Sequence, residues 1–192
     1  MPNTNNKNGF ILPHGGYRKL LSYKKAEIVY DATVYFCRRF YDKKDRTIDQ
    51  MIQAARSCKQ NIAEGSMASG TSKETEIKLT NVARASLEEL LIDYQDFLRV
   101  RHLKEWDKEN PYVKRLRVLN QIPDGNYETF RKGIENEDPE ICANVIIGLI
   151  KVTSFLLKRQ LGFLEEDFVN EGGLRERMTT ARIKKRNKKG EN

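Results

Sequence analysis

Histidine is the side chain in this sequence best suited to acid–base or metal chemistry, and the chain has only His14 and His102. A di-iron site in a helical bundle requires the pattern Glu-x-x-His, but Arg99 stands three residues before His102. Nucleases built on small helical bundles commonly place an arginine before the histidine with four to six residues between them, yet the positions that would serve His102, residues 95–97, are Gln-Asp-Phe. Neither histidine is expected in a core, where it could serve a serine or cysteine nucleophile.

Cysteine is the second reactive residue type, represented by Cys37, Cys58 and Cys142. The three are far apart and form no C-x-x-C pair, so neither a disulfide framework nor a zinc site is indicated. Buried, reduced thiols in a cytoplasmic protein are the expectation. Glycine-rich phosphate-binding loops are also missing from the sequence. The sequence therefore predicts a protein without catalytic residues, metal or cofactor, and a cryptic enzyme would need a group that co-purifies.

Serine, asparagine and glutamate residues recur at helical spacing in two segments. Ser57, Asn61 and Glu64 stand at i, i+4 and i+7, while Ser86 and Glu89 stand at i and i+3. Alanines beside them would let two helices approach closely. Polar groups in such a packed contact must be paired, which makes them suited to fixing helix register. We interpret the five residues as a structural polar seam, with a ligand-binding role as the alternative.

The elements that must position these residues are helices. Apolar residues recur at helical spacing in the segments 18–41, 47–65, 71–98 and 138–169. Thr47 with Gln50, and Thr71 with Glu74, match capping boxes that would open the second and third helices. The third helix has an apolar stripe too broad for one partner, so a second contact is expected, within the chain or between subunits.

The remaining segments are an arm, an insertion and a tail. Asn110-Pro111 and Asp138-Pro139 are helix-start patterns, and they bracket a polar stretch that is too poor in apolar residues for its own core. In the tail, Leu174, Met178 and Ala181 share one helical face. We expect a flexible arm (1–16), an all-α, antiparallel up-down-up-down four-helix bundle (17–170) with a helical insertion (105–138), and a basic C-terminal tail (171–192).

Positive charge is concentrated in two regions of the sequence. The chain has a formal net charge of +8, of which residues 1–104 carry +6 and the last 22 residues carry +5. Such asymmetry favours an anionic partner, most often nucleic acid, although a solvated basic surface is the alternative for each cluster. Few aromatic residues interleave with these charges, so contact with the phosphate backbone is expected rather than base stacking. The candidate contacts are Arg38, Arg39, Lys43, Lys44, Arg46, Arg182, Lys184, Lys185, Arg186, Lys188 and Lys189.

Membrane association is not expected from the sequence. The N-terminus has no apolar run of signal-peptide length, and charged residues interrupt the apolar stretch 145–164. The apolar face of the tail is small, which disfavours attachment to a membrane surface. A cytoplasmic location is expected.

Five short motifs resemble one known family. They are YKKA (23–26), DQMIQAARS (49–57), NIAEG (61–65), TSKE (71–74) and ARASLEEL (83–90). This set resembles the four-helix-bundle proteins related to the 23S rRNA intervening-sequence protein, a group that includes the accessory variability protein of diversity-generating retroelements. The insertion and the tail resemble a longer form with a C-terminal suffix.

The resemblance implies an up-down-up-down bundle that assembles into a ring-like homopentamer. Some relatives bind RNA or DNA, and the retroelement member also binds a reverse transcriptase. We therefore expect a non-enzymatic, oligomeric scaffold that binds nucleic-acid backbone through basic surfaces. The alternative is a protein–protein adaptor that docks a partner enzyme such as a reverse transcriptase.

Overall fold

The computed structural model describes residues 11, 14–122 and 125–190, and all regular secondary structure in these ranges is helical. The predicted all-α class is thus confirmed. In chain order the elements are η1 (Tyr17–Lys19), α1 (Leu21–Phe40), α2 (Thr47–Ala68), α3 (Lys73–Val100), α4 (Pro111–Asn120), α5 (Tyr127–Ile134), α6 (Pro139–Glu171) and α7 (Leu174–Gly190).

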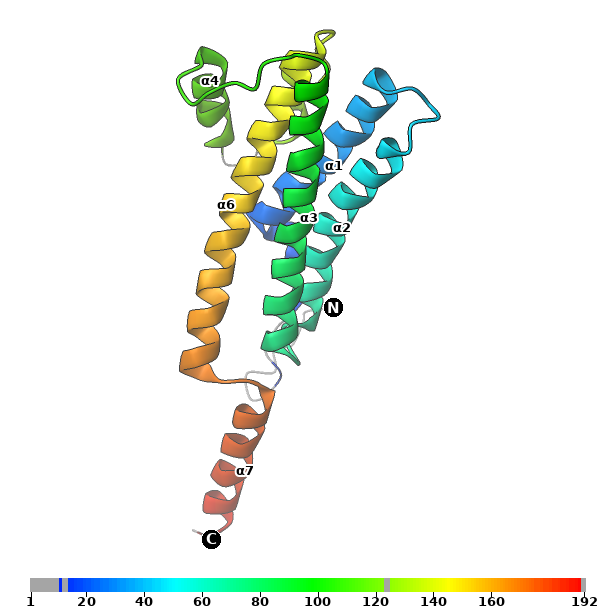
Figure 1. Cartoon of the computed structure of the whole chain (residues 1–192). Coiled ribbons are helices and arrows are strands. Elements are labelled where there is room, and N and C mark those ends of the chain that lie inside the picture. Colours follow the sequence, from blue (N-terminus) through cyan, green and yellow to red (C-terminus); the bar gives the residue numbers. More distant parts are fainter. Residues whose placement is uncertain (1–10, 12–13, 123–124, 191–192) are drawn as a thin grey trace, which may run out of the picture.

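The four longest helices, α1, α2, α3 and α6, lie side by side and supply most of the buried apolar residues (Figure 1). Helix α2 packs against α1 and α3, and α6 packs against α1 and α3. The short helices α4 and α5 pack on α6 near the end where α6 begins. Helix α7 extends beyond the opposite end of the four helices (Figure 1). The insertion and the tail are therefore far apart.

Aromatic rings form the centre of the core between α1 and α3. The Phe36 ring lies 4.9 Å from that of Tyr94 and 4.7 Å from that of Phe97, measured between ring centroids. The Tyr94 hydroxyl donates a hydrogen bond to Thr33 Oγ1 at 3.2 Å, so this fully buried polar atom has a partner. These contacts bury the apolar stripe of α1, as the residue spacing predicts.

The second helix begins at the predicted residue, but its predicted capping box and its predicted end are wrong. Thr47 is already the first residue of α2, and its backbone N–H donates to Asp45 Oδ1 at 2.9 Å instead of entering a capping box with Gln50. The helix also continues past Gly65 to Ala68. Gly65 lies inside the helix at a close contact with α3, where an added Cβ would be 3.3 Å from the backbone oxygen of Glu76.

The N-terminal signals of the later helices are mostly local and predictable. Asn110 and Asp138 cap α4 and α6 through their side chains, as expected from the prolines that follow them. For α3 the prediction is wrong by one residue, because Ser72 rather than Thr71 accepts the capping bond from the Thr75 N–H. Thr71 instead donates its hydroxyl hydrogen to the Ala68 carbonyl.

Helix α6 is the most apolar element of the chain. By length and composition alone, the stretch Pro139–Asn187 contains a helix that could cross a membrane, and 56% of its most apolar window is buried inside the structure. The core helix of a soluble protein has the same properties. The buried part of α6 is the part that packs on α1, α3 and α5.

Candidate nucleic-acid interface

The first predicted basic region surrounds the turn between α1 and α2, and we call it the α1–α2 cluster. Its members are Arg38, Arg39, Lys43, Lys44 and Arg46, and all five are exposed. The two arginines occupy the last turn of α1, where positive charge also stabilises the helix dipole. The structure thus brings all five predicted side chains into one region of the surface.

Two aspartates reduce the charge of the α1–α2 cluster. Asp42 Oδ1 accepts a hydrogen bond from the Lys44 N–H at 2.9 Å, and Asp45 Oδ1 accepts one from the Thr47 N–H at the same distance. The bonds from Thr47 lower the pKa of Asp45, so this carboxylate stays ionised. Both aspartates therefore have a structural role in the turn, and they offset part of the positive charge around it.

The second predicted basic region is helix α7. The sequence of this helix carries eight basic residues and one acidic residue, and none of its described side chains is buried. Arg182, Lys184, Lys185 and Arg186 are all exposed. The side chains of the other two predicted contacts, Lys188 and Lys189, lie outside the described part of the chain.

Helix α7 is joined to α6 by a tight turn. Gly172 has a φ of +69°, a conformation that L side chains rarely adopt. The Gly173 N–H donates to Glu176 Oε2 at 2.9 Å, and Arg177 donates to the Gly172 carbonyl at 3.4 Å. These bonds fix where α7 begins relative to the end of α6.

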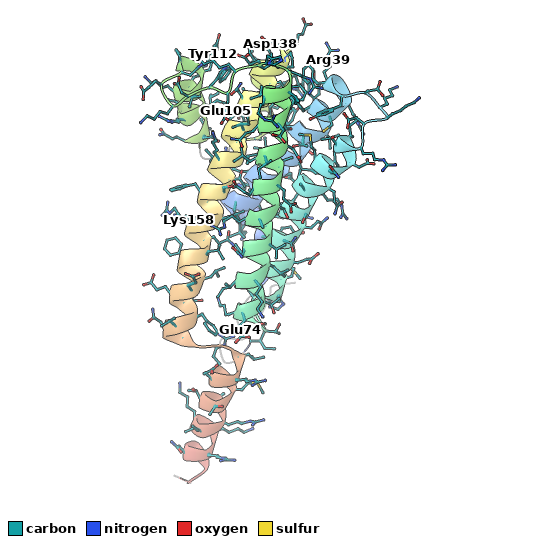
Figure 2. All side chains as sticks on the ribbon, in the orientation of Figure 1. Arg39, Glu74, Glu105, Tyr112, Asp138 and Lys158 are labelled. Atoms are coloured by element: carbon teal, nitrogen blue, oxygen red, sulfur yellow. The ribbon has the colours of Figure 1, made fainter. Side chains whose placement is uncertain are left out.

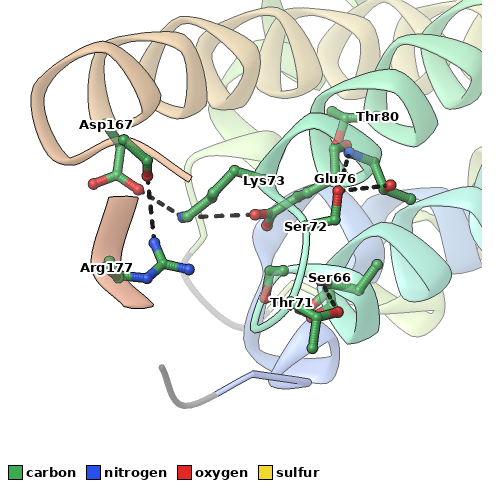
Figure 3. A network of polar contacts seen from close by, with 12 residues as sticks. Ser66, Thr71, Ser72, Lys73, Glu76, Thr80, Asp167 and Arg177 are labelled. Atoms are coloured by element: carbon green, nitrogen blue, oxygen red, sulfur yellow. Dashed lines mark hydrogen bonds and ion pairs between the residues drawn. The ribbon is translucent and has the colours of Figure 1, made fainter. Parts of the chain in front are cut away.

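A charged network ties the end of α6 to the start of α3 (Figure 3). Lys73 Nζ lies 2.6 Å from Asp167 Oδ2 and 3.6 Å from Glu76 Oε2. Burial lowers the pKa of Lys73, but the bond to Asp167 and the charge of Glu76 outweigh it and raise the net pKa. Figure 3 also shows Arg177 of α7 pointing toward Asp167. The network therefore lies where α7 begins, between the end of α6 and the start of α3.

The structure does not bring the two basic regions together. Arg39 lies at the end of the molecule where α6 begins, whereas Glu74 and the start of α7 lie at the other end (Figures 1 and 2). A single chain therefore presents two separate basic surfaces, with the length of the four helices between them.

Of the five residues of the predicted polar seam, the structure brings three together, Ser57, Asn61 and Ser86. Ser57 Oγ and Ser86 Oγ lie 2.9 Å apart across α2 and α3, and Asn61 Nδ2 donates to the Ser57 carbonyl at 2.8 Å and to Ser57 Oγ at 3.2 Å. Glu64 and Glu89 are exposed, which corrects their predicted place in the seam. A carboxylate without a cation beside it is unfavourable to bury, so both side chains face solvent.

Glu89 instead lines a shallow acidic hollow next to the seam. Asp49 and Asp93 share this hollow of about 640 Å³. Burial raises the pKa of Asp93, and the nearby charges of Asp96 and Glu89 add to the effect. Within the described ranges, no three His, Cys, Asp or Glu side chains are placed to hold a metal ion. The hollow has the wrong charge for a polyanion, which leaves the basic regions as the candidate interface.

The histidines and cysteines lie where the sequence predicts. His102 is exposed at the end of α3 with a φ of +57°, and the exposed His14 packs its ring next to Gly70. The three cysteines are buried, unpaired thiols. Burial raises the pKa of each to about 12, so the thiolate form is scarce at neutral pH.

Two features near the insertion were not found from the sequence. Lys25 of α1 is buried, and its Nζ lies 4.6 Å from the centroid of the Phe130 ring. The ring of Trp106 stacks on that of Tyr112, a residue of α4. Lys25 and Phe130 meet only in the folded chain, and Trp106 is held by hydrogen bonds to α6, so residue spacing signals neither feature.

Comparison of the chain with protein-family models, curated proteins and solved structures gave no match. The fold and the basic regions therefore define an all-α protein with two separated basic surfaces.

Proposed function

We propose that this protein is a non-enzymatic, oligomeric scaffold that binds the backbone of RNA or DNA through its basic surfaces. Helix α7 carries the proposal: it has eight basic residues and one acidic residue, and its described residues 181–187 are all exposed. Each phosphate that such a helix neutralises releases a counterion, which favours binding without base specificity. The α1–α2 cluster provides a second surface of the same sign.

We further infer the arrangement that the family resemblance implies, an antiparallel up-down-up-down bundle of α1, α2, α3 and α6 that forms a homopentamer. The pairwise packing of these helices supports the bundle. Exposed apolar side chains on neighbouring helices support a subunit interface, because such patches mark interaction sites. They are Val82 (45% exposed) and Ile92 (50%) on α3, with Phe155 (58%) and Phe163 (62%) on α6. A pentamer would carry five copies of α7.

The cytoplasm is the proposed location, in keeping with the three buried, unpaired thiols.

The test is a binding titration with labelled duplex RNA and duplex DNA, followed by fluorescence anisotropy. Affinity should fall at least tenfold between about 50 and 200 mM salt, because counterion release drives binding. Replacing Lys184 and Lys185 with glutamine should weaken binding and reduce the salt dependence of the affinity. Neutralising Lys108 and Arg117, two exposed residues of the insertion, removes equal charge and should have little effect. Absence of binding at low salt, or equal loss in both variants, would refute the proposal.

A protein–protein adaptor is the second candidate function, favoured by the same exposed apolar side chains on α3 and α6. In this case the patch docks a partner enzyme such as a reverse transcriptase, and surface charge steers the encounter. Isolation of the protein from native lysate with and without nuclease separates the two functions. A partner that needs nucleic acid is released by nuclease, whereas an adaptor keeps its partner.

A further inference from the structure

A cavity lies between α4, α5 and α6, at the opposite end of the molecule from α7. Its volume of about 370 Å³ falls in the range of small-molecule sites. Leu116, Phe130 and Val145 provide an apolar lining, one from each of the three helices.

Glycine contacts hold the helices around the cavity. Leu116 is the one buried side chain of α4, and it packs on Gly148 of α6. A Cβ added to Gly148 would lie only 3.2 Å from Leu116 Cδ1. A Cβ on Gly133 of α5 would lie 2.8 Å from Val145 Cγ2. Helices α4 and α5 thus meet α6 at narrow contacts, and the space between these contacts stays open.

A stacked aromatic pair forms one wall of the cavity. The rings of Trp106 and Tyr112 are 5.0 Å apart between centroids with planes inclined by 22°. The backbone N–H of Trp106 donates to Asn144 Oδ1 at 2.7 Å, and its Nε1 donates to Glu140 Oε1 at 3.4 Å. These bonds to α6 hold the indole in place. The pair therefore presents a positioned wall against which a planar ring can stack or pack edge-on.

The charged side chains that line the cavity favour an anion. Arg115 of α4 and Lys132 of α5 are exposed lining residues, and neither side chain makes a hydrogen bond or ion pair with another residue in the described ranges. The one lining carboxylate, Glu128, is already paired with Arg131 at 2.6 Å. Two cations without partners thus stand beside an aromatic and apolar surface.

We propose that this cavity binds a small aromatic anion. The planar ring of the ligand packs on the Trp106–Tyr112 pair, and its carboxylate, sulfonate or phosphate group is held by Arg115 and Lys132. Guanidinium and ammonium groups bind such anions through charge-assisted hydrogen bonds. This site is independent of the basic surfaces that bind nucleic acid in the proposed function.

Trp106 is the only tryptophan in the chain, so its fluorescence reports on this site. The probe is anilinonaphthalene sulfonate, and the control ligand is phenylnaphthylamine, which has the same rings without the anionic group. We expect saturable quenching of Trp106 by the sulfonate, with at least tenfold weaker binding of the neutral compound. That ratio corresponds to about 1.4 kcal/mol.

Variants distinguish the site from general dye binding. Arg115→Gln with Lys132→Gln should weaken sulfonate binding about tenfold or more, by loss of two charge-assisted bonds. Lys108→Gln with Arg117→Gln removes the same charge outside the cavity lining and should leave affinity unchanged. Equal thermal melting curves establish that both proteins fold. The proposal is overturned by unsaturable quenching, by equal affinity for the neutral compound, or by equal loss in both variants.

Discussion

The hydroxyl groups of Ser57 and Ser86 lie 2.9 Å apart and join helices α2 and α3. Each also has a local partner, since Asn61 Nδ2 donates to Ser57 Oγ and Ser86 can donate to the Val82 carbonyl. The contact is partly buried, where a hydrogen bond has more effect than at the surface. It sets how α2 is placed along α3.

The first prediction concerns the energy of this serine pair. Ser57→Ala and Ser86→Ala should each lower the free energy of unfolding by about 1 kcal/mol, the usual net value of one hydrogen bond. The double variant should lose less unfolding free energy than the two single variants together, which gives a coupling energy of about 0.5 kcal/mol or more. Urea unfolding of the four proteins measures this cycle. Strict additivity would show that the two hydroxyls do not interact.

The second prediction compares two helical glycines. Gly133→Ala should lower the free energy of unfolding by about 1 kcal/mol or more, because its Cβ would be forced against the stiff side chain of Val145. Gly162→Ala should raise it by about 0.5–1 kcal/mol, since nothing lies within 4 Å of the new Cβ and alanine favours a helix. Urea midpoints measure both effects. A gain in stability at both positions would contradict the close contact between α5 and α6.

The third prediction concerns the pH dependence of stability at Lys25. Burial lowers the pKa of this lysine below its ordinary 10.5, and its Nζ has no hydrogen-bond partner among the residues described. Between the lowered pKa and 10.5 the unfolded chain binds more protons than the folded chain, so stability should rise with pH.

Lys25→Met should remove this rise of stability with pH. It should also stabilise the protein at pH values below the lowered pKa of Lys25, where the folded wild-type protein holds a buried charge. Lys19→Met, at an exposed position, should keep the wild-type dependence. The measurement is the urea midpoint across the alkaline range. An unchanged slope in Lys25→Met would show that the folded protein keeps this lysine fully charged.

The fourth prediction concerns self-association. If the protein forms the proposed oligomer, Phe155→Glu should break it into smaller species, because Phe155 is one of the exposed apolar side chains of α3 and α6 from which the interface is inferred. Val118→Glu is the control, since Val118 on α4 is similarly exposed, at 64% against 58% for Phe155. Light scattering gives the subunit number of each variant. A wild-type monomer, or equal dissociation by both variants, would rule out this interface.

Local signals made much of the fold predictable from the sequence. Asp138 and Pro139 mark the start of α6 because an N-cap and a first-turn proline act within a few residues. Gly65 misled the prediction because its role is to allow a tertiary contact with Glu76, which sequence spacing does not reveal. Thr71 misled it because Ser72, an equally suitable cap, stands next to it.

The candidate site was predictable only in part. Basic side chains such as Lys184 are mostly exposed because a buried charge is costly, so composition locates them, and the buried Lys25 is an exception. Glu64 and Glu89 have the spacing of the serines in the seam, but their charge turns them to solvent. The cavity beside Trp106 could not be predicted, because three helices and a loop must assemble before it exists.

Helix α7 buries none of its described side chains, so tertiary packing adds little to its stability. Its own charges oppose it, because like charges four residues apart, such as Arg182 and Arg186, destabilise a helix by about 0.2–0.5 kcal/mol per pair. Phosphate groups that neutralise these side chains remove the repulsion. Helical order in the tail and association with a polyanion are thus thermodynamically linked, and each strengthens the other.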